Sequence, residues 1–443
     1  MSEHLKKEIG FGAALSTVMG TVIGAGVFFK ASSVYQVTGS AGLGLLAWVL
    51  GGVITICAGL TGAELAAAIP KTGGMLTYIE HTYGKIASHL LGWAQTIIYF
   101  PANVAALAII FGTQVVNLFG LDTSYGLWIA VITSVILALI NFMGSKVAGK
   151  VQTISMIGKL IPIALIIIFG LFQKNPVHIQ LFPSSHGASG NVLSALGSGL
   201  LATMFAYDGW IHVGNIAGEL KNPKKDLPKA ISLGLLGIMV IYLFINVAFL
   251  MTLAVGNIAG NPNAASDVAM KLFGSMGGKL ITIGILISVY GTMNGYMMTG
   301  MRIPYVMAVE NRLPFSNWLK KLNKNQVPAN AGITILVIAI VMMISGKFDM
   351  LTDMLVFVIW IFYTMTFLAV FILRKREPEL ERPYKVPLYP VIPCVALLGG
   401  LFIVINTLCT QTGLAMLGLV ATLLGLVFYK RDHGPTLSEE EKR

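Results

Sequence analysis

The chain has 443 residues, of which 56% are hydrophobic and only 11% are charged. A soluble protein of this length needs a more polar surface, so the composition excludes a soluble globular protein and indicates that lipid is the main solvent. The net charge of +11 raises the question of nucleic acid, but the positions of the basic residues along the chain have to be considered first.

Membrane-spanning helices need roughly 20 apolar residues each, and such stretches recur through the whole chain. Only short connectors separate them, the longest being 173–190, 256–278 and 310–328, so no soluble domain is expected. We therefore predict an all-α polytopic membrane protein. Its twelve predicted spans begin near Phe11, Gly42, His89, Tyr125, Val151, Val192, Ala230, Leu280, Ala329, Met350, Leu388 and Leu414.

The basic residues are distributed unevenly between the two faces that these spans define. If the N-terminus is cytoplasmic, about 24 of the 30 Lys and Arg residues fall on the inner face, as the positive-inside rule requires. The net charge then reflects topology, and no nucleic-acid partner is expected. We predict a cell-membrane protein with both termini cytoplasmic. The remaining basic residues are outside (Lys174, Lys271, Lys279 and Lys347) or within spans (Lys30 and Lys159).

Spans one and six each contain a helix-breaking segment near mid-membrane. The first is Gly24-Ala25-Gly26 and the second is Ala206-Tyr207-Asp208-Gly209. Five spans separate them, and an odd number of spans per repeat gives an inverted repeat, in which paired interruptions indicate the binding site. This predicts one repeat over 1–172, a second over 173–376, two further helices over 377–429 and a cytoplasmic tail over 430–443.

The first interruption has the polarity that a bound amino acid requires. The N–H groups that start its outer half, near Gly26 and Val27, suit a carboxylate, and the carbonyls that end its inner half, near Val22 and Ile23, suit an ammonium. In lipid an unpaired backbone group costs several kcal/mol, so a ligand could supply the missing partner. The alternative is that these small residues serve only a close helix crossing.

Ionisable residues within spans six and five are the next candidates, because a charge in the membrane needs a partner. Asp208 contacts the substrate or, as we favour, caps the inner half-helix beside the site. Phe205 is placed to cover the substrate as a gate. Lys159 lies about nine residues into span five, roughly 13 Å deep at 1.5 Å per residue. Free carbonyls from spans one and eight are its expected partners, and a neutral structural lysine is the alternative.

Weaker candidates lie in spans one, two and eight. Ser288, Gly291 and Asn294 either line the site or hold helices together. Glu64 is expected to be a surface or loop anchor rather than a proton carrier, and Lys30 is expected to be structural and near an aqueous vestibule. His212 alone supports no proton relay. The sequence contains no P-loop, HExxH motif, CxxC pair or serine–histidine arrangement, which argues against an enzyme and predicts no cofactor and no metal.

Several segments together resemble the amino acid, polyamine and organocation superfamily, and more narrowly its bacterial L-amino acid transporter branch. They are GTVIGAGVFFK at 20–30, GKLIP at 158–162, FAYDGW at 205–210 and GELKNPKKDLPKAI at 218–231. The resemblance covers essentially the whole chain and is closest to alanine-serine-cysteine and serine/threonine exchangers. It implies the five-plus-five inverted-repeat fold of the leucine transporter with two extra C-terminal helices, and sodium-independent antiport.

The resemblance also implies roles for individual residues. Lys159 matches the family's fifth-span lysine, which links that helix to carbonyls of spans one and eight. Ala25 stands where many relatives have serine, and Asp208 where relatives that carry large aromatic substrates have glycine. The loop FGLDTSYG at 119–126 has no cysteine for a disulfide to a heavy-chain partner. The implied substrate-binding segments are Val22, Ile23, Gly24, Ala25 and Gly26, then Phe205, Ala206, Tyr207 and Asp208.

We expect exchange of small neutral L-amino acids, of the alanine, serine, cysteine, threonine and glycine type, by alternating access. Lysine at position 159 in place of a bound Na⁺ predicts that sodium is not required. A proton-coupled importer of amino acids or organic cations is the alternative carrier, and a channel or a transporter-like sensor is the alternative class. Flux that requires a counter-substrate distinguishes the exchanger from each of them.

Overall fold

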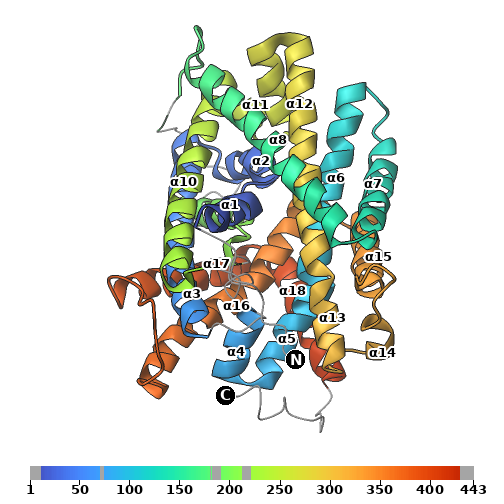
Figure 1. Cartoon of the computed structure of the whole chain (residues 1–443). Helices are drawn as coiled ribbons and strands as arrows, with labels where there is room; N and C mark the ends of the chain where they lie inside the picture. The colour runs from blue at the N-terminus through green and yellow to red at the C-terminus, as the bar shows by residue number, and fades with distance from the viewer. Residues whose placement is uncertain (1–10, 70–73, 180, 182–190, 212–220, 430–443) are drawn as a thin grey trace.

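The computed structural model describes residues 11–69, 74–179, 181, 191–211 and 221–429 (Figure 1). All regular secondary structure within these ranges is helical, which confirms the predicted all-α class. The helices are α1 Phe11–Val22, α2 Gly26–Thr38, α3 Ala41–Ala68, α4 Met75–Tyr83, α5 Lys85–Ala94, η1 Gln95–Tyr99, α6 Phe100–Phe119, α7 Tyr125–Phe142, α8 Ser145–Leu171, α9 Val192–Ala206, α10 Pro223–Thr252, α11 Val255–Ile258, α12 Ala264–Gly300, α13 Arg302–Val309, α14 Ser316–Leu319, α15 Ala329–Ser345, α16 Phe348–Arg376, α17 Val391–Thr410, α18 Thr412–Leu423 and α19 Gly425–Phe428.

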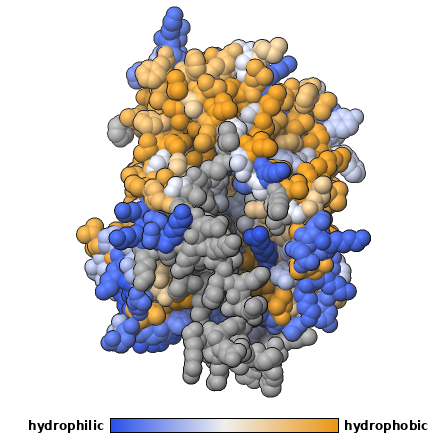
Figure 2. Space-filling model, in the orientation of Figure 1, coloured by the Kyte–Doolittle hydropathy of each residue, from blue (hydrophilic) through white to orange (hydrophobic). Residues whose placement is uncertain are grey.

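The twelve predicted spans all correspond to helices of the described chain. Eight helical stretches are long and apolar enough to cross a membrane, and three shorter apolar stretches are α9, α15 and the α18–α19 segment. The interrupted pair α1 and α2 forms the remaining span. Figure 2 shows a mainly apolar surface over the upper half of this view, with hydrophilic residues mainly in the lower half. We call the lower end, where α16 finishes with Arg374, Lys375 and Arg376, the basic face.

The outer face of helix α7 is apolar, as a surface in contact with lipid should be. Trp128, Ile132, Ile136 and Leu139 are exposed, and their spacing places them along one face of the helix. The opposite face is buried and includes Ser134, whose hydroxyl donates to the Ala130 carbonyl oxygen at 2.8 Å. A soluble helix has its apolar residues on the buried side, so this inverted pattern indicates a membrane-spanning helix.

Helix packing follows the two-repeat arrangement. Helix α1 packs against α10, and its counterpart α9 packs against α3. In the same way α8 packs against α12, and α16 packs against α6. In Figure 1, α3 and α10 lie together on the left, and α6 and α7 lie together on the right. The interrupted helices α1, α2 and α9 lie inside this frame, so the frame positions the candidate site.

The region between spans seven and eight differs from the prediction. We expected a connector over 256–278, but the chain forms α11 and then the first part of α12, which starts at Ala264 rather than near Leu280. Gly274 interrupts α12 with φ 70° and ψ −179°. A positive φ is favourable only for glycine, so the chain turns here between a short helix and the apolar span that follows.

Candidate functional site

The first predicted interruption is present in the structure. Helix α1 ends at Val22 and α2 begins at Gly26, leaving residues 23–25 between them. Ala25 occupies the N-cap position of α2 and makes no side-chain capping hydrogen bond. The first N–H groups of any helix lack intrahelical partners, so this helix start keeps the capacity to bind an anion.

The second interruption begins where predicted. Helix α9 ends at Ala206, and Tyr207, Asp208 and Gly209 form a turn. Gly209 has φ 107°, a conformation that residues with a side chain rarely adopt. Residues 212–220, which include His212, lie outside the described chain, so the inner half-helix that Asp208 was predicted to cap is not described.

The two interruptions are in contact with each other. A Cβ atom added to Gly26 would lie 2.5 Å from Ala206 Cα, and one added to Gly209 would lie 2.9 Å from the Thr21 carbonyl oxygen. Ala25 and Ala206 are both almost completely buried. The backbone of the first break therefore lies directly against the backbone of the second, inside the protein.

Substituting Gly26 tests how closely these backbones must approach. We expect Gly26→Ala to lower substrate exchange about fivefold or more, because overpacking a tight contact costs about 1–3 kcal/mol and 1.4 kcal/mol is a factor of ten. The matched control is Gly12→Ala on α1, where an added Cβ meets nothing within 4 Å. Equal exchange rates for the two variants in proteoliposomes would contradict the importance of this contact.

Lys159 on α8 binds the end of the first half-helix. Its side chain is 2% exposed, and its ammonium donates to the carbonyl oxygens of Gly20 and Ile23, each at 2.5 Å. The expected partners on span one are present. Within the described chain the ammonium makes no hydrogen bond to span eight, because α12 is helical from 275 to 300 and its carbonyls bond within the helix.

Tyr242 on α10 joins the two interruptions and was missed by the sequence analysis. Its hydroxyl oxygen lies 3.1 Å from the Val22 carbonyl oxygen and 2.8 Å from the Ala206 carbonyl oxygen. One hydroxyl has one proton to donate, so it can serve either carbonyl at a time. The carbonyls of Val22 and Ile23, which we expected to be free, therefore already have protein donors beside them.

Three tyrosines surround the Asp208 carboxylate, and the sequence analysis missed all of them. Tyr99 donates to Oδ2, Tyr363 donates to Oδ1 at 2.8 Å, and Tyr296 lies 3.4 Å from Oδ2. Asp208 is 3% exposed. A buried carboxylate needs such donors, so this arrangement accounts for an acid in an apolar span.

The position of Tyr99 depends on a local irregularity in span three. Residues Gln95–Tyr99 form a π-helical turn, in which the Phe100 N–H donates to the Gln95 carbonyl oxygen. Pro101 follows at once and has no N–H to donate. Such π-turns occur frequently at functional sites, and this one directs Tyr99 to the end of the second interruption.

The fifth helix of each repeat thus holds the broken first helix of its own repeat. On α8, Lys159 binds carbonyls at the end of α1, and on α16, Tyr363 binds Asp208 just after α9. The first contact joins an ammonium to backbone carbonyls and the second joins a tyrosine hydroxyl to a carboxylate, but both lie at equivalent places in the two repeats. Movement of either interruption must therefore involve the helix that holds it.

A charged cluster lies beside the site on the side away from the basic face. Lys30 Nζ lies 3.0 Å from Asp349 Oδ1 and 3.3 Å from Asp353 Oδ1. The same ammonium lies 5.8 Å from the ring centre of Phe205 and 5.2 Å from that of Phe348, which is cation–π range. Lys30 is fully buried, whereas the Asp349 side chain beside it is 51% exposed, so a structural Lys30 near an aqueous vestibule stays a prediction. The cluster joins α2, α9 and α16.

The span-eight candidates separate into different environments. Asn294 bonds the side chains of Asn141 and Gln152 and the Ala148 carbonyl oxygen. Gly291 packs so closely on Ser155 that an added Cβ would lie 2.2 Å from its Cβ. These two residues therefore join helices α7, α8 and α12.

Two other residues of α12, Ser288 and Thr292, lie one turn apart on the same face of the helix. Ser288 is buried, and its carbonyl oxygen accepts a hydrogen bond from Thr292 at 2.9 Å. Thr292 lies nearest the first break: a Cβ added to Gly24 would lie 2.8 Å from its methyl carbon and 2.9 Å from its hydroxyl oxygen. The sequence analysis did not select Thr292, because one threonine in an apolar helix gives no distinguishing signal.

Glu64 is an anchor, as predicted, but it is not on the surface. Its carboxylate accepts from Arg374 Nε at 2.8 Å and Nη2 at 2.6 Å, and from the Val386 N–H at 2.7 Å. Arg382 Nε lies 3.7 Å away. The glutamate is 1% exposed. It fixes the segment after α16 to the C-terminal end of α3.

The fold, with two contacting helix breaks inside a frame of paired spans, can now be compared with known families of membrane proteins. The amino acid permease family matches residues 9–427, and the chain belongs to that family. The match covers both interruptions and the helices that hold them. It agrees with the twelve-helix, inverted-repeat fold of the leucine transporter, with α17 and the α18–α19 segment as the two added spans.

Relatives of known function narrow the class further. The chain is 44% identical to the serine/threonine exchanger SteT of Bacillus subtilis over 427 residues, which is 96% of each chain. It is 29% identical to the human cystine/glutamate transporter over 96% of this chain and 85% of that protein. It is also 29% identical to the human large neutral amino acids transporter small subunit 2, over 96% and 80%.

These findings show a multi-pass membrane protein that transports amino acids and is not an enzyme. The tyrosines that surround Asp208 and the bridging Tyr242 are details of this site that the family assignment alone does not give.

Proposed function

We propose that this protein exchanges small neutral L-amino acids across the membrane by alternating access. The observation that carries the proposal is the direct contact between two interrupted helices, with Gly26 against Ala206. The uncapped start of α2 would receive the substrate carboxylate. The carbonyls at the ends of α1 and α9 would receive its ammonium, with Tyr242 shifting its hydrogen bond between Val22 and Ala206 as the substrate enters.

The proposed independence of sodium rests on Lys159. Its ammonium donates to two carbonyl oxygens of α1, which are ligands of the kind a bound cation would use. A Na⁺ ion at the same carbonyls would be repelled by this ammonium. We propose that the counter-substrate, rather than a sodium gradient, drives transport.

The proposed preference for small side chains rests on the crowding at the first break. Thr292 lies against Gly24, and Ala206 lies against Gly26. The Thr292 hydroxyl is a polar group at this position, and it suits a hydroxyl-bearing side chain. The name of the serine/threonine exchanger to which the chain is similar agrees with this preference.

Exchange can be measured with the full chain in proteoliposomes. We expect uptake of labelled L-alanine only when the vesicles contain L-serine, at the same rate when external Na⁺ is replaced by K⁺. D-alanine should fail to compete, because the helix ends fix the positions of both charged groups. Empty vesicles that take up L-alanine under a proton gradient would instead support the proton-coupled importer, and ligand binding without any flux would support a sensor.

The proposed topology places the basic face and both termini in the cytoplasm, since most Lys and Arg residues then follow the positive-inside rule. The charged cluster around Lys30 would then lie on the outer side of the membrane. We further propose that the protein works without a disulfide-linked heavy chain, because the loop between α6 and α7 carries no cysteine. The two repeats would span 1–172 and 173–376, with 377–429 as the added helices and 430–443 as a cytoplasmic tail.

A further inference from the structure

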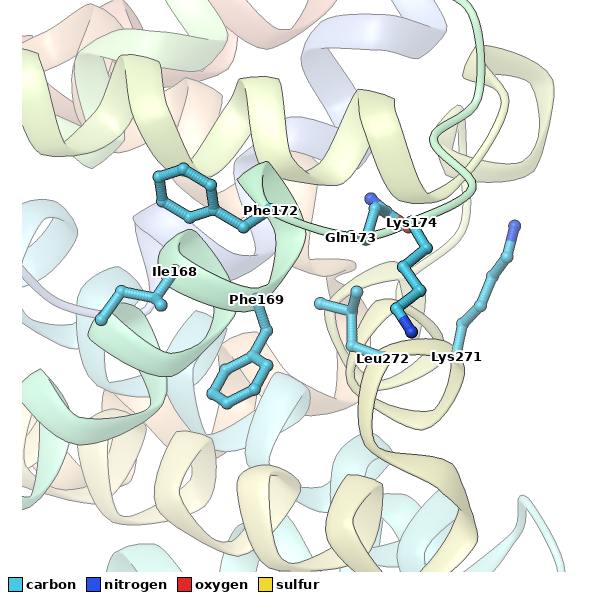
Figure 3. Close-up of a pocket in the computed structure, with 7 residues that line it drawn as sticks. All are labelled: Ile168, Phe169, Phe172, Gln173, Lys174, Lys271 and Leu272. Carbon is cyan, nitrogen blue, oxygen red and sulfur yellow. The ribbon is translucent and has the colours of Figure 1, made fainter.

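A surface pocket of about 410 Å³ opens far from the transport site, between the end of α8 and the first part of α12 (Figure 3). It lies at the end of the molecule opposite the basic face. Helix α10 shows this, because it starts beside the lysine-rich segment 221–229 and ends at Thr252, next to the pocket. The volume falls within the range of about 300–1,000 Å³ that small-molecule sites occupy.

Two lysines line the pocket, and one of them is held firmly in place. Lys271 Nζ donates to the Thr252 carbonyl oxygen at 2.5 Å. Gln173 donates to the Thr252 hydroxyl oxygen at 3.0 Å and to the Gly170 carbonyl oxygen at 2.8 Å. An ammonium has three N–H donors, so Lys271 retains donors for a ligand. Lys174 extends from the chain just after α8.

The charge of the pocket is not balanced by its own lining. Among the described residues that line it, none is acidic, so Lys174 and Lys271 give it a charge of +2. Basic residues are uncommon on this side of the protein, as the positive-inside rule requires. Two of the four lysines assigned to that side nevertheless line this one pocket, which indicates that it binds an anion.

Exposed apolar side chains continue the pocket along α8. Ile168, Phe169 and Phe172 form one side of it, and Figure 3 shows both lysines on the other side. Phe172 is 83% exposed. Helix α8 is a membrane-spanning helix, so these side chains meet lipid. A soluble anion would gain nothing from them, whereas the acyl chains of a lipid would.

We propose that this pocket binds an anionic glycerophospholipid, with the phosphate between Lys174 and Lys271 and an acyl chain along Ile168, Phe169 and Phe172. The lipid would connect the end of α8 to the first part of α12. Because Lys159 also lies on α8, the bound lipid would fix the outer end of the helix that holds the first interruption.

Native mass spectrometry of the purified full chain, titrated with phosphatidylglycerol or phosphatidylcholine, tests the proposal. We expect the wild-type protein to prefer phosphatidylglycerol. The double variant Lys174→Gln, Lys271→Gln should bind it about 25-fold more weakly, from about fivefold for each lysine near the membrane surface. Glutamine at 271 removes the charge and keeps a polar side chain.

The control variant Lys279→Gln, Lys347→Gln makes the same charge change at two exposed lysines outside the pocket. Equal phosphatidylglycerol affinity in the wild type and the pocket variant would overturn the proposal, as would an equal loss in the control. Displacement of the lipid by inorganic phosphate at the same concentration would show a site for free anions and would also overturn it. If the double variant unfolds, the exposed single variant Lys174→Gln should still show about a fivefold loss.

Discussion

Replacing Lys159 by alanine is expected to lower amino acid exchange at least tenfold while the protein stays folded in the membrane. The ammonium makes two charge-assisted hydrogen bonds to the end of α1, each contributing about 1.5–3 kcal/mol. Losing either one changes an equilibrium between two arrangements of α1 by about tenfold or more. We therefore expect at least a tenfold loss of exchange in proteoliposomes. The loss should be larger if both hydrogen bonds stabilise the same arrangement of α1.

Two further variants separate charge from hydrogen bonding. Lys159→Gln keeps donor N–H groups without the charge and should retain part of the activity. Lys150→Ala removes an exposed lysine from the same helix and should leave exchange unchanged. Exchange at the wild-type rate by the Lys159→Ala protein would remove the lysine from the transport mechanism and leave it a structural residue.

Replacing Glu64 by alanine is expected to cause the largest loss of stability. The substitution leaves Arg374 and Arg382 close together without the carboxylate that they share. It also leaves the Val386 N–H, which is buried, without its acceptor. Breaking a buried ion pair by removing one partner costs about 3–5 kcal/mol. The thermal unfolding midpoint of the purified protein should fall clearly below that of the wild type.

The control for this experiment is Glu379→Ala, which removes an exposed glutamate from the same segment after α16. It should leave the unfolding midpoint nearly unchanged, because an exposed charge contributes little. Glu64→Gln should lie between the two, since an amide oxygen can still accept one hydrogen bond. An unfolding midpoint for Glu64→Ala equal to that of Glu379→Ala would contradict the anchoring role.

The spans and the first break were predictable because their causes are local. Length and hydropathy determine a membrane helix, and three small residues at 24–26 weaken a helix wherever it packs. The partner of Lys159 on span one followed from the need of a buried ammonium for oxygen atoms. The helix over 264–273 was missed because it is too short to cross a membrane and carries Asp267 and Lys271, so it resembles a connector.

The surroundings of Asp208 were not predictable in the same way. Tyr99, Tyr296 and Tyr363 come from three different helices, and a buried tyrosine signals only that its hydroxyl needs some partner. The partner itself is fixed by tertiary packing. The same holds for Tyr242, which reaches carbonyls 220 and 36 residues away along the chain. A single sequence contains no signal for such distant pairs.

The most direct test of this account is a structure of the protein determined with L-serine bound. The account predicts that the substrate carboxylate lies within hydrogen-bond distance of N–H groups at 24–27, and that the ammonium lies at the carbonyls that end α1 and α9. A substrate bound elsewhere, or an α1–α2 segment that forms one continuous helix around it, would contradict the proposed mechanism.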